Sequence, residues 1–323
     1  MSDNERSLVG DIGGSNARFA IARREGESVA LDHIVSMRCG ERADLAAAVE
    51  HYLATTGAAR PASAAIAIAG PIVGDRAEIT NHQSWSFSIA AARERLRLTR
   101  LAVINDFTAI ALSLPHLTPP DLRQVGGGGA TPGAPMAAIG PGTGLGVSGI
   151  VKATDRWIAI EGEGGHATFA PMTERESRIA DVLRARLGHV SWERVLSGPG
   201  LVNLYGAVAQ LEGRQAEALS PETIAERGRT GTCSLCSEAL AVFCAGLGTA
   251  AGNLALTFGA RGGVYLAGGI LPRLGAFLAA SEFRARFESK GRLSPYVRLI
   301  PTYLVTAANP GLIGAATAAL HPL

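Results

Sequence analysis

Lysine is nearly absent from this chain of 323 residues, whose 30 basic residues include only Lys152 and Lys290. Neither lysine stands in the G-K-[ST] arrangement that lets a P-loop reach nucleotide phosphates, so a Walker-type site is excluded. The basic residues are balanced by 28 acidic ones, and the net charge is only +2. Such a small charge creates no field that would collect nucleic acid or an anionic membrane, so we expect neither as a partner.

Cysteine is also scarce. Four residues, Cys39, Cys233, Cys236 and Cys244, are too few and too unevenly placed for a disulfide framework in a chain of this length, which favours a reducing compartment. The pair Cys233 and Cys236 has the spacing of a redox or zinc site, but no second pair of cysteines or histidines follows it. We therefore favour two ordinary thiols at the start of a helix over a metal or redox site.

The sequence has no recognisable export signal, because residues 1–8 are polar and charged and lack an apolar segment with a cleavage site. A cytoplasmic location is therefore expected. Residues 239–260 carry no charge over 22 residues, which is long enough to cross a bilayer. Because this stretch contains Gly246, Gly248 and Gly252, we interpret it as a buried helix instead.

The length and the 47% apolar content predict two lobes with a cleft, since single cores stop growing at roughly 250 to 300 residues. Strands and helices alternate early in the chain, as in an α/β lobe, and a Pro- and Gly-rich stretch over 115–135 places a lobe boundary near 115–118. The expected elements of the first lobe are a hairpin over 8–18, helices over 44–53 and 89–98, and strands over 64–69 and 101–104.

The later part of the chain is predicted to be mostly helical after a second hairpin that turns at 140–146. The capping box at Thr173 opens a helix to about Leu187. Ser220 and Pro221 supply the cap and first residue of another helix. The remaining expected elements are the buried helix ending near Gly259, strands over 263–266 and 297–305, and a closing helix from Pro310 that packs on the first lobe.

Three glycine turns stand out as candidate ligand-binding loops. Asp11 precedes Gly13 and Gly14 at the end of a predicted strand, where main-chain N–H groups can approach a phosphate without a Cβ in the way. The turn at 140–146 adds the hydroxyl of Thr143, and the segment 267–269 follows a buried strand. Each turn alone could be simple chain reversal, but three in one chain favour a binding function.

Polar groups gather at other predicted strand ends and loops. Asn105 and Asp106 end a hydrophobic strand, where α/β proteins place ligands, although Asp106 could instead cap the following helix. The loop 161–166 combines two carboxylates with His166 and could hold sugar hydroxyls or be a solvated acidic turn. Glu193 lies where a helix is expected to start, so it could be an exposed first-turn carboxylate.

In the order in which they occur, these segments resemble the bacterial glucokinase family, within the hexokinase, actin and Hsp70 superfamily. The resemblance covers nearly the whole chain. It implies an α/β, two-lobed actin-like ATPase (ribonuclease H-like) fold with a cleft between a smaller domain, 1–116 plus 307–323, and a larger one, 117–306. The motifs that carry it are Gly10–Arg18, Thr80–His82, Ile104–Phe107, Gly142–Gly146, Glu163–His166, Glu193–Tyr205, Leu266–Ile270 and Asn309–Gly311.

The resemblance implies transfer of phosphate from Mg-ATP to the 6-hydroxyl of D-glucose, as the entry to glycolysis. Asp106 would be the general base on that hydroxyl. The side chains implied to hydrogen-bond the other hydroxyls are Asn105, Glu163, His166 and Glu193. A sugar lacking one hydroxyl would leave a partner unpaired, so such a site can discriminate strongly.

The resemblance also implies an ATP and Mg²⁺ site. Asp11 would orient the magnesium through water, and Ser15 replaces the threonine usual at its position while keeping a hydroxyl. Gly13, Gly14 and Ser15 would cradle the outer phosphates, and Gly10, Asp11 and Ile12 complete the implied nucleotide-binding loop. Further implied contacts come from Gly142, Thr143 and Gly144 to the same phosphate chain, and from Gly268 and Gly269 to the adenosine. A homodimer is expected from the family alone.

Two other functional interpretations remain open from the sequence. A related kinase of the ROK group could act on another hexose, but such proteins commonly carry a cysteine-rich zinc motif after the loop that ends at His166, and here no cysteine follows until Cys233. The second alternative is a non-catalytic regulator that binds sugar or ATP. A DNA-binding regulator would need a helix-turn-helix, and few residues precede the first strand.

Overall fold

The computed structural model describes residues 6–26, 28–79, 85–154 and 156–320. Contacts within the chain group it into two compact units. The first unit comprises Met1–Thr118, Ala153–Glu161 and Ala307–Leu323, and the second comprises Pro119–Lys152 and Gly162–Thr306. The domain limits drawn from the resemblance stay a prediction.

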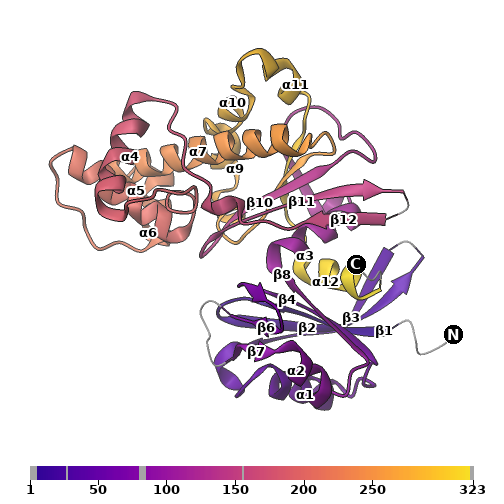
Figure 1. The fold of residues 1–323 in the computed structure, drawn as a ribbon. Coiled ribbons are helices and arrows are strands. Elements are labelled where there is room, and N and C mark those ends of the chain that lie inside the picture. Colours follow the sequence, from indigo (N-terminus) through magenta and orange to yellow (C-terminus); the bar gives the residue numbers. More distant parts are fainter. Residues whose placement is uncertain (1–5, 27, 80–84, 155, 321–323) are drawn as a thin grey trace. The chain divides into compact units, whose positions relative to one another are not determined.

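The first unit is built on a five-stranded sheet in the order β3-β2-β1-β4-β8 (Figure 1). β1, β2 and β3 are antiparallel neighbours, whereas β1, β4 and β8 run parallel. The strands are β1 (Arg6–Ile12), β2 (Asn16–Glu25), β3 (Ser28–Arg38), β4 (Ser63–Ile68) and β8 (Arg100–Asn105), beside a small sheet of β5 (Ile72–Val73), β6 (Arg76–Ala77) and β7 (Phe87–Ser88).

Helices cover both faces of the first sheet. On one side, α1 (Leu45–Thr56) and α2 (Ile89–Arg95) enclose a hydrophobic core to which alternate residues of β1, Leu8 and Ile12, contribute. On the other side, α3 (Asp106–Ser113) packs against α12 (Pro310–Leu320), which also contacts β1 and β4. The predicted return of the closing helix to the first part of the chain is therefore confirmed.

The second unit contains a six-stranded sheet in the order β12-β11-β10-β13-β14-β9. β10, β13 and β14 are parallel, and β11 and β9 pair antiparallel to β10 and β14. The edge strand β12 lies in the segment that the contacts group with the first unit. The strands are β9 (Leu122–Gly126), β10 (Met136–Pro141), β11 (Leu145–Ala153), β12 (Arg156–Ile160), β13 (Val264–Leu266) and β14 (Thr302–Val305).

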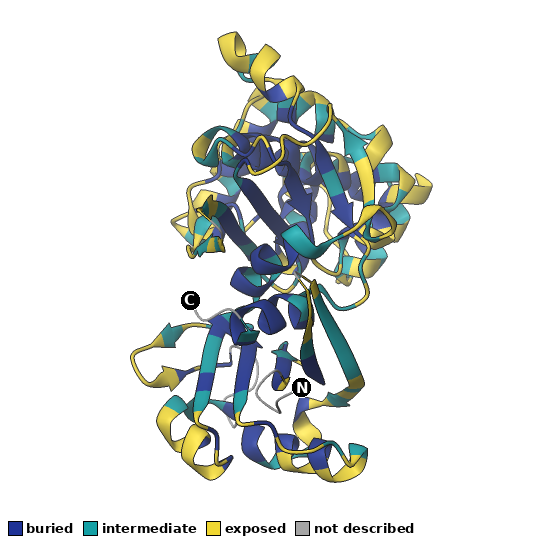
Figure 2. Cartoon of the chain, turned by 90° about the vertical axis from the view of Figure 1, so that its right-hand side faces the viewer, coloured by how far each residue is buried: buried dark blue, intermediate teal, exposed yellow. Residues whose placement is uncertain are grey.

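A long central helix, α7 (Ser234–Phe258), organises the helical part of the second unit and contacts α5, α6 and α10. Its length and composition would suit a membrane span, but most of it is buried in the core, as predicted. Within each unit, Figure 2 shows buried residues along the central strands and exposed ones on the outer helices and loops. Gly248 lets α10 approach, because a Cβ there would overlap the main-chain oxygen of Phe283.

The other helices of the second unit are α4 (Glu174–Leu187), α5 (Gly198–Leu211), α6 (Pro221–Thr230), α8 (Leu271–Leu274), α9 (Ala276–Ala280), α10 (Phe283–Glu288) and α11 (Ser294–Arg298). Short 3-10 turns occur along the chain at Cys39–Glu41, Leu114–His116, Pro119–Asp121, Gly164–His166 and Gly291–Leu293.

Local signals predicted the helix starts well and the last strand poorly. Thr173 and Ser220 cap α4 and α6 through their hydroxyls, as expected. The strand predicted over 297–305 is wrong in its first part. Val297 belongs to α11, where Pro295 occupies the first turn, and Pro301 separates that helix from β14.

The contact between α12 and α3 yields a stability prediction. A Cβ at Gly314 would overlap the main-chain oxygen of Ala109, which cannot move without displacing α3. We expect Gly314→Ala to lower the free energy of unfolding by about 1–3 kcal/mol through overpacking, measured by chemical denaturation.

Gly206 in α5 provides the matched control, because a Cβ there would meet only the Arg186 guanidinium at 3.5 Å. Gly206→Ala should raise stability by about 0.5–1 kcal/mol through helix propensity. Equal effects of the two substitutions would contradict the close packing of α12 on α3.

Candidate active site

In the first unit, parallel strand ends bring the predicted residues to one edge of the sheet. Ile12 of β1 pairs in register with Ile68 of β4, and Ile68 pairs with Asn105 of β8. Strand spacing of about 4.8 Å then places the ends of β1 and β8 about 10 Å apart. The segment around Asp11 and the segment of Asn105 and Asp106 therefore belong to the same edge of one sheet.

Asp11 lies on the face of β1 that α12 covers. A Cβ on Gly311, in the first turn of α12, would come within 2.7 Å of the Asp11 carboxyl carbon. Burial raises the pKa of Asp11, and Arg18, whose Nη1 lies 3.5 Å from Oδ2, partly offsets that effect. The structure thus holds a partly desolvated carboxylate beside a helix N-terminus, which favours negative charge.

The turn after β1 leaves main-chain donors available. Gly13 donates its N–H to Asn16, and the N–H of Cys39 donates to the carbonyl oxygen of Ser15. Among the described residues, the N–H groups of Gly14 and Ser15 have no such acceptor. Two such donors are compatible with an anionic ligand, and the phosphate-binding role of this loop stays a prediction.

Two residues of the predicted nucleotide loop face the core instead. Ile12 is fully buried, and a Cβ at Gly10 would press on Ile66 at 2.7 Å and on Phe19 at 3.1 Å. Neither residue therefore presents a side chain to a ligand.

Asn105, not Asp106, caps helix α3. Its Oδ1 accepts hydrogen bonds from the N–H groups of Phe107, at 2.8 Å, and Thr108, at 3.3 Å. The alternative in which Asp106 caps this helix is therefore wrong. Asp106 is the first residue of the helix and is half-buried, with Oδ1 accepting the Phe107 N–H at 2.9 Å.

In the second unit, Glu193 joins two of the predicted loops. Its Oε2 accepts the N–H of Leu145 at 3.0 Å and lies 4.0 Å from Nε2 of His166. Its own N–H donates to the oxygen of Gly165 at 2.8 Å. Glu193 sits in a turn before α5, so the expected position in a first helical turn is wrong.

Small residues make this arrangement possible. A Cβ on Gly144 would come within 2.6 Å of Glu193 Oε2, and one on Gly165 would overlap the oxygen of Leu145. The oxygen of Gly142 accepts the N–H of Gly198 at 2.8 Å, so this loop lies against the first residue of α5. The structure therefore brings His166, Glu193 and the 142–144 loop together.

The other predicted residues of this unit lie on exposed chain. Glu163 and His166 are both exposed, and the side chain of Glu163 caps no helix. Thr143 is exposed at the tip of its turn. Gly268 has φ +87°, and a Cβ there would come within 2.5 Å of the oxygen of Pro141, so the 267–269 turn packs against the end of β10.

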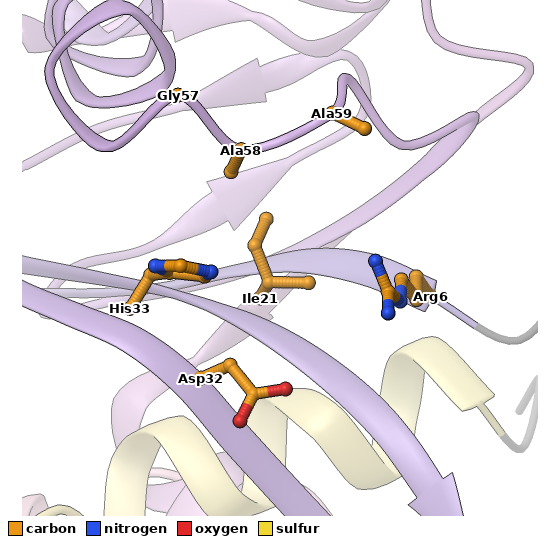
Figure 3. A pocket seen from close by; sticks show the side chains of 7 residues that line it. All are labelled: Arg6, Ile21, Asp32, His33, Gly57, Ala58 and Ala59. Carbon is orange, nitrogen blue, oxygen red and sulfur yellow. The ribbon is translucent and has the colours of Figure 1, made fainter.

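Other features of the described residues add no second candidate. A pocket of about 180 Å³ lies in the first unit, where the side chains of Arg6 and His33 point toward each other across Ile21 (Figure 3). It includes none of the predicted site residues. Within the described ranges no group of three or more His, Cys, Asp or Glu side chains is placed to hold a metal ion. The motif Thr80–His82 lies outside the described residues.

Comparison with known proteins settles the family. The sequence model of the Glucokinase family matches residues 8–322. This chain belongs to the glucokinase family. Curated glucokinases include that of Aromatoleum aromaticum, 51% identical over 98% of this chain and 95% of the relative, and that of Chromobacterium violaceum, 52% identical over 96% and 88%.

Solved structures of glucokinases share the fold. A glucokinase from an Antarctic psychrotroph has a TM-score of 0.89 at 37% identity, with 98% of each chain covered. A ROK family glucokinase from Streptomyces griseus, in complex with glucose and AMPPNP, has a TM-score of 0.63 over 97% of this chain and 99% of its own. At 19% identity that likeness shows the fold alone. The expected two-lobed α/β fold of the glucokinase family is confirmed.

One contributor to the site escaped the sequence reasoning. Asn309–Gly311 helped to identify the glucokinase family, but no role followed from it. The structure shows that Gly311 is needed for the close approach of α12 to Asp11. A glycine after a proline signals a helix start, yet no local pattern tells which distant side chain it contacts.

The desolvation of Asp11 yields a pH prediction. At pH 7 the ionised carboxylate costs stability, because burial raises its folded pKa above the ordinary value of 3.8. Asp11→Asn should therefore not lower the melting temperature at pH 7. The same substitution should abolish most phosphoryl transfer, because the family resemblance gives Asp11 the role of orienting magnesium. Wild type should regain stability relative to this variant as pH falls through the raised folded pKa toward 3.8.

Asp44 is a suitable control because its pKa is shifted in the opposite direction to that of Asp11. Hydrogen bonds from Ala47 N–H and Arg95 outweigh burial and lower the pKa of Asp44. Asp44→Asn should therefore lower the melting temperature at pH 7 and leave activity intact. A melting temperature that fell as far for Asp11→Asn as for Asp44→Asn would contradict the account of Asp11.

Proposed function

We propose that this chain transfers the γ-phosphoryl group of ATP to the 6-hydroxyl of D-glucose, giving glucose 6-phosphate and ADP, and so feeds glycolysis. The observation that carries the proposal is the placement of Asp106 at the carboxyl end of β8, on the sheet edge it shares with the Asp11 turn. Parallel strand ends are where α/β proteins bind ligands. Family membership supplies the reaction class.

Asp106 is proposed as the general base. A carboxylate at this point can accept the proton of the 6-hydroxyl as its oxygen attacks the γ-phosphorus. The N–H of Phe107 holds Oδ1 at 2.9 Å, which fixes the orientation of the carboxylate. Because phosphoryl transfer depends mainly on positioning, this fixed orientation is what the protein contributes at the acceptor oxygen.

The remaining sugar hydroxyls are assigned to four side chains. Asn105 uses Oδ1 for its cap, so its amide Nδ2 is left to donate to a hydroxyl. Glu193 uses Oε2 for Leu145, which orients Oε1 as an acceptor. His166, 4.0 Å from that carboxylate, and the exposed Glu163 complete the set. Asn105 and Glu193 each have one atom held by the main chain, so the atom that remains has a defined direction toward a hydroxyl, which supports a hexose as substrate.

The glycine turns are assigned to ATP. The N–H groups of Gly14 and Ser15, which have no main-chain acceptor within the described ranges, would hold phosphate oxygens, with the Ser15 hydroxyl beside them. The 142–144 loop lies against the N-terminus of α5, which favours negative charge. Gly268 and Gly269 are exposed and would face the adenosine.

Magnesium is proposed to be held chiefly by the nucleotide. The described residues offer no cluster of three ligands, whereas Mg²⁺ commonly keeps several waters and binds through phosphates and one or two carboxylates. The partly desolvated Asp11 fits the role of orienting that hydrated ion. When bound, the ion would neutralise phosphate charge during transfer.

Compartment and assembly are also proposals. The four cysteines are free thiols, which supports a cytoplasmic enzyme. The proposed homodimer rests on the family resemblance. The near-zero net charge supports a small-molecule substrate over nucleic acid or membrane partners.

The decisive substitution is Asp106→Asn. Asparagine keeps the shape and can still accept the Phe107 N–H, so glucose binding measured by calorimetry should be unchanged. Turnover should fall by at least roughly a hundredfold, because the base is lost. Coupled assay of ADP release with saturating glucose gives the turnover number.

Glu174→Gln is the matched control, since Glu174 is likewise a carboxylate at the first residue of a helix, α4. Both substitutions remove a favourable interaction with a helix dipole, but only Asp106→Asn should affect turnover. Unchanged turnover in Asp106→Asn would remove Asp106 from the mechanism.

A further inference from the structure

The Cys233 and Cys236 pair at the start of α7 has a geometry that the proposed kinase reaction does not use. Cys233 is the N-cap of the helix, and its sulfur accepts the N–H of Cys236 at 3.4 Å. Cys233 is partly exposed, whereas Cys236 is fully buried. The first residue is therefore partly accessible to solvent, whereas the second is not.

The charges around the pair favour a thiolate at Cys233. Arg214, which donates to the Ser234 hydroxyl at 3.2 Å, acts on Cys233 from the loop after α5. Arg227 of α6 pairs with Glu217 at 3.1 Å, and the two charges act on the pKa of Cys236 in opposite directions.

The two thiols differ in acidity as a consequence. Burial alone would raise the pKa of Cys233, but hydrogen bonds from the Cys236 thiol and from the N–H groups of Cys236 and Leu235 outweigh it and lower that pKa. Burial and the neighbouring Cys233 raise the pKa of Cys236 to about 12. An acidic outer thiol with a buried partner three residues later is the arrangement of dithiol redox sites.

Metal binding explains the pair less well. A structural zinc site needs four ligands, and within the described ranges no third His, Cys, Asp or Glu joins these two sulfurs. The other cysteines are unlike Cys233: Cys39 and Cys244 are buried, and burial raises the pKa of each. They serve as internal controls.

We propose that Cys233 and Cys236 form a redox-active dithiol that exchanges with a low-molecular-weight disulfide. The Cys233 thiolate attacks one sulfur of that disulfide, forming a mixed disulfide and expelling one thiolate, which takes up a proton. Cys236 then loses its proton and attacks the Cys233 sulfur, forming the intramolecular disulfide and expelling the second thiolate. The protein loses two electrons and two protons, and the small disulfide is reduced to two thiols.

Oxidised glutathione is the probe, added to the full chain at pH 7 and followed by intact-mass and peptide mass spectrometry. Wild type should lose two hydrogen atoms, located to the peptide containing Cys233 and Cys236. Cys236→Ala should stop at the mixed disulfide and gain one glutathionyl group on Cys233. Cys233→Ser should give neither product while keeping the helix cap, because serine is a good N-cap residue.

The rate of alkylation distinguishes an activated thiol from one that is merely exposed. Alkylation of Cys233 by iodoacetamide in Cys236→Ala should remain faster at pH 7 than in its Arg214→Gln derivative. Arg229→Gln, which removes another surface arginine that pairs with Glu226, should leave that rate unchanged. Kinase activity should persist in Cys233→Ser.

Two results would overturn the proposal. The first is wild type that keeps both thiols under conditions in which oxidised glutathione modifies an unstructured cysteine peptide. The second is glutathionylation in Cys236→Ala that maps to Cys39 or Cys244 instead of Cys233.

Discussion

The close approach of helix α12 to strand β1 is the constraint on which the first unit depends. Gly311 and Gly314 permit it, because a Cβ at either position would collide with Asp11 or with the main chain of α3. The same contact removes water from the Asp11 carboxylate and raises its pKa. One packing contact late in the chain thus positions a group near its beginning, and the buried Asp11 carboxylate lowers the stability of the fold at neutral pH.

In the second unit, one residue likewise holds distant segments of the chain together. Glu193 ties the turn before α5 to the start of β11 and to the loop of Gly165, and glycines at 144 and 165 leave room for it. A carboxylate with one oxygen committed to the main chain has a fixed orientation. Each unit therefore carries its own set of oriented polar groups on a rigid scaffold, which is what discrimination among sugar hydroxyls requires.

Sequence reasoning succeeded where the signal was local. Hydroxyl caps at Thr173 and Ser220 and the uncharged stretch of α7 predicted helices correctly because propensity and capping act within one turn. It failed where distant contacts decide, as at Glu193, whose role depends on Leu145, 48 residues away.

The candidate site was likewise predictable where the signal is local and unpredictable where it depends on distant contacts. Its residues could be chosen from the sequence because they lie at strand ends and in glycine turns. Which of two adjacent residues caps α3, or that Gly311 packs on Asp11, follows only from the folded arrangement. The cysteine pair was interpreted from the sequence as ordinary thiols. The lowered pKa of Cys233 arises chiefly from hydrogen bonds donated by the Cys236 thiol and by the N–H groups of Cys236 and Leu235, which only the folded cap provides.

The central claim is that this member of the glucokinase family phosphorylates glucose. The most direct test is ATP-dependent phosphorylation by the wild-type chain of glucose, mannose, fructose, galactose, glucosamine and N-acetylglucosamine, with ADP release in the absence of sugar as the control. Turnover dominated by glucose is the predicted result. Dominance of another sugar would contradict the assignment of Asn105, Glu163, His166 and Glu193, and ADP release without any sugar acceptor would contradict the kinase itself.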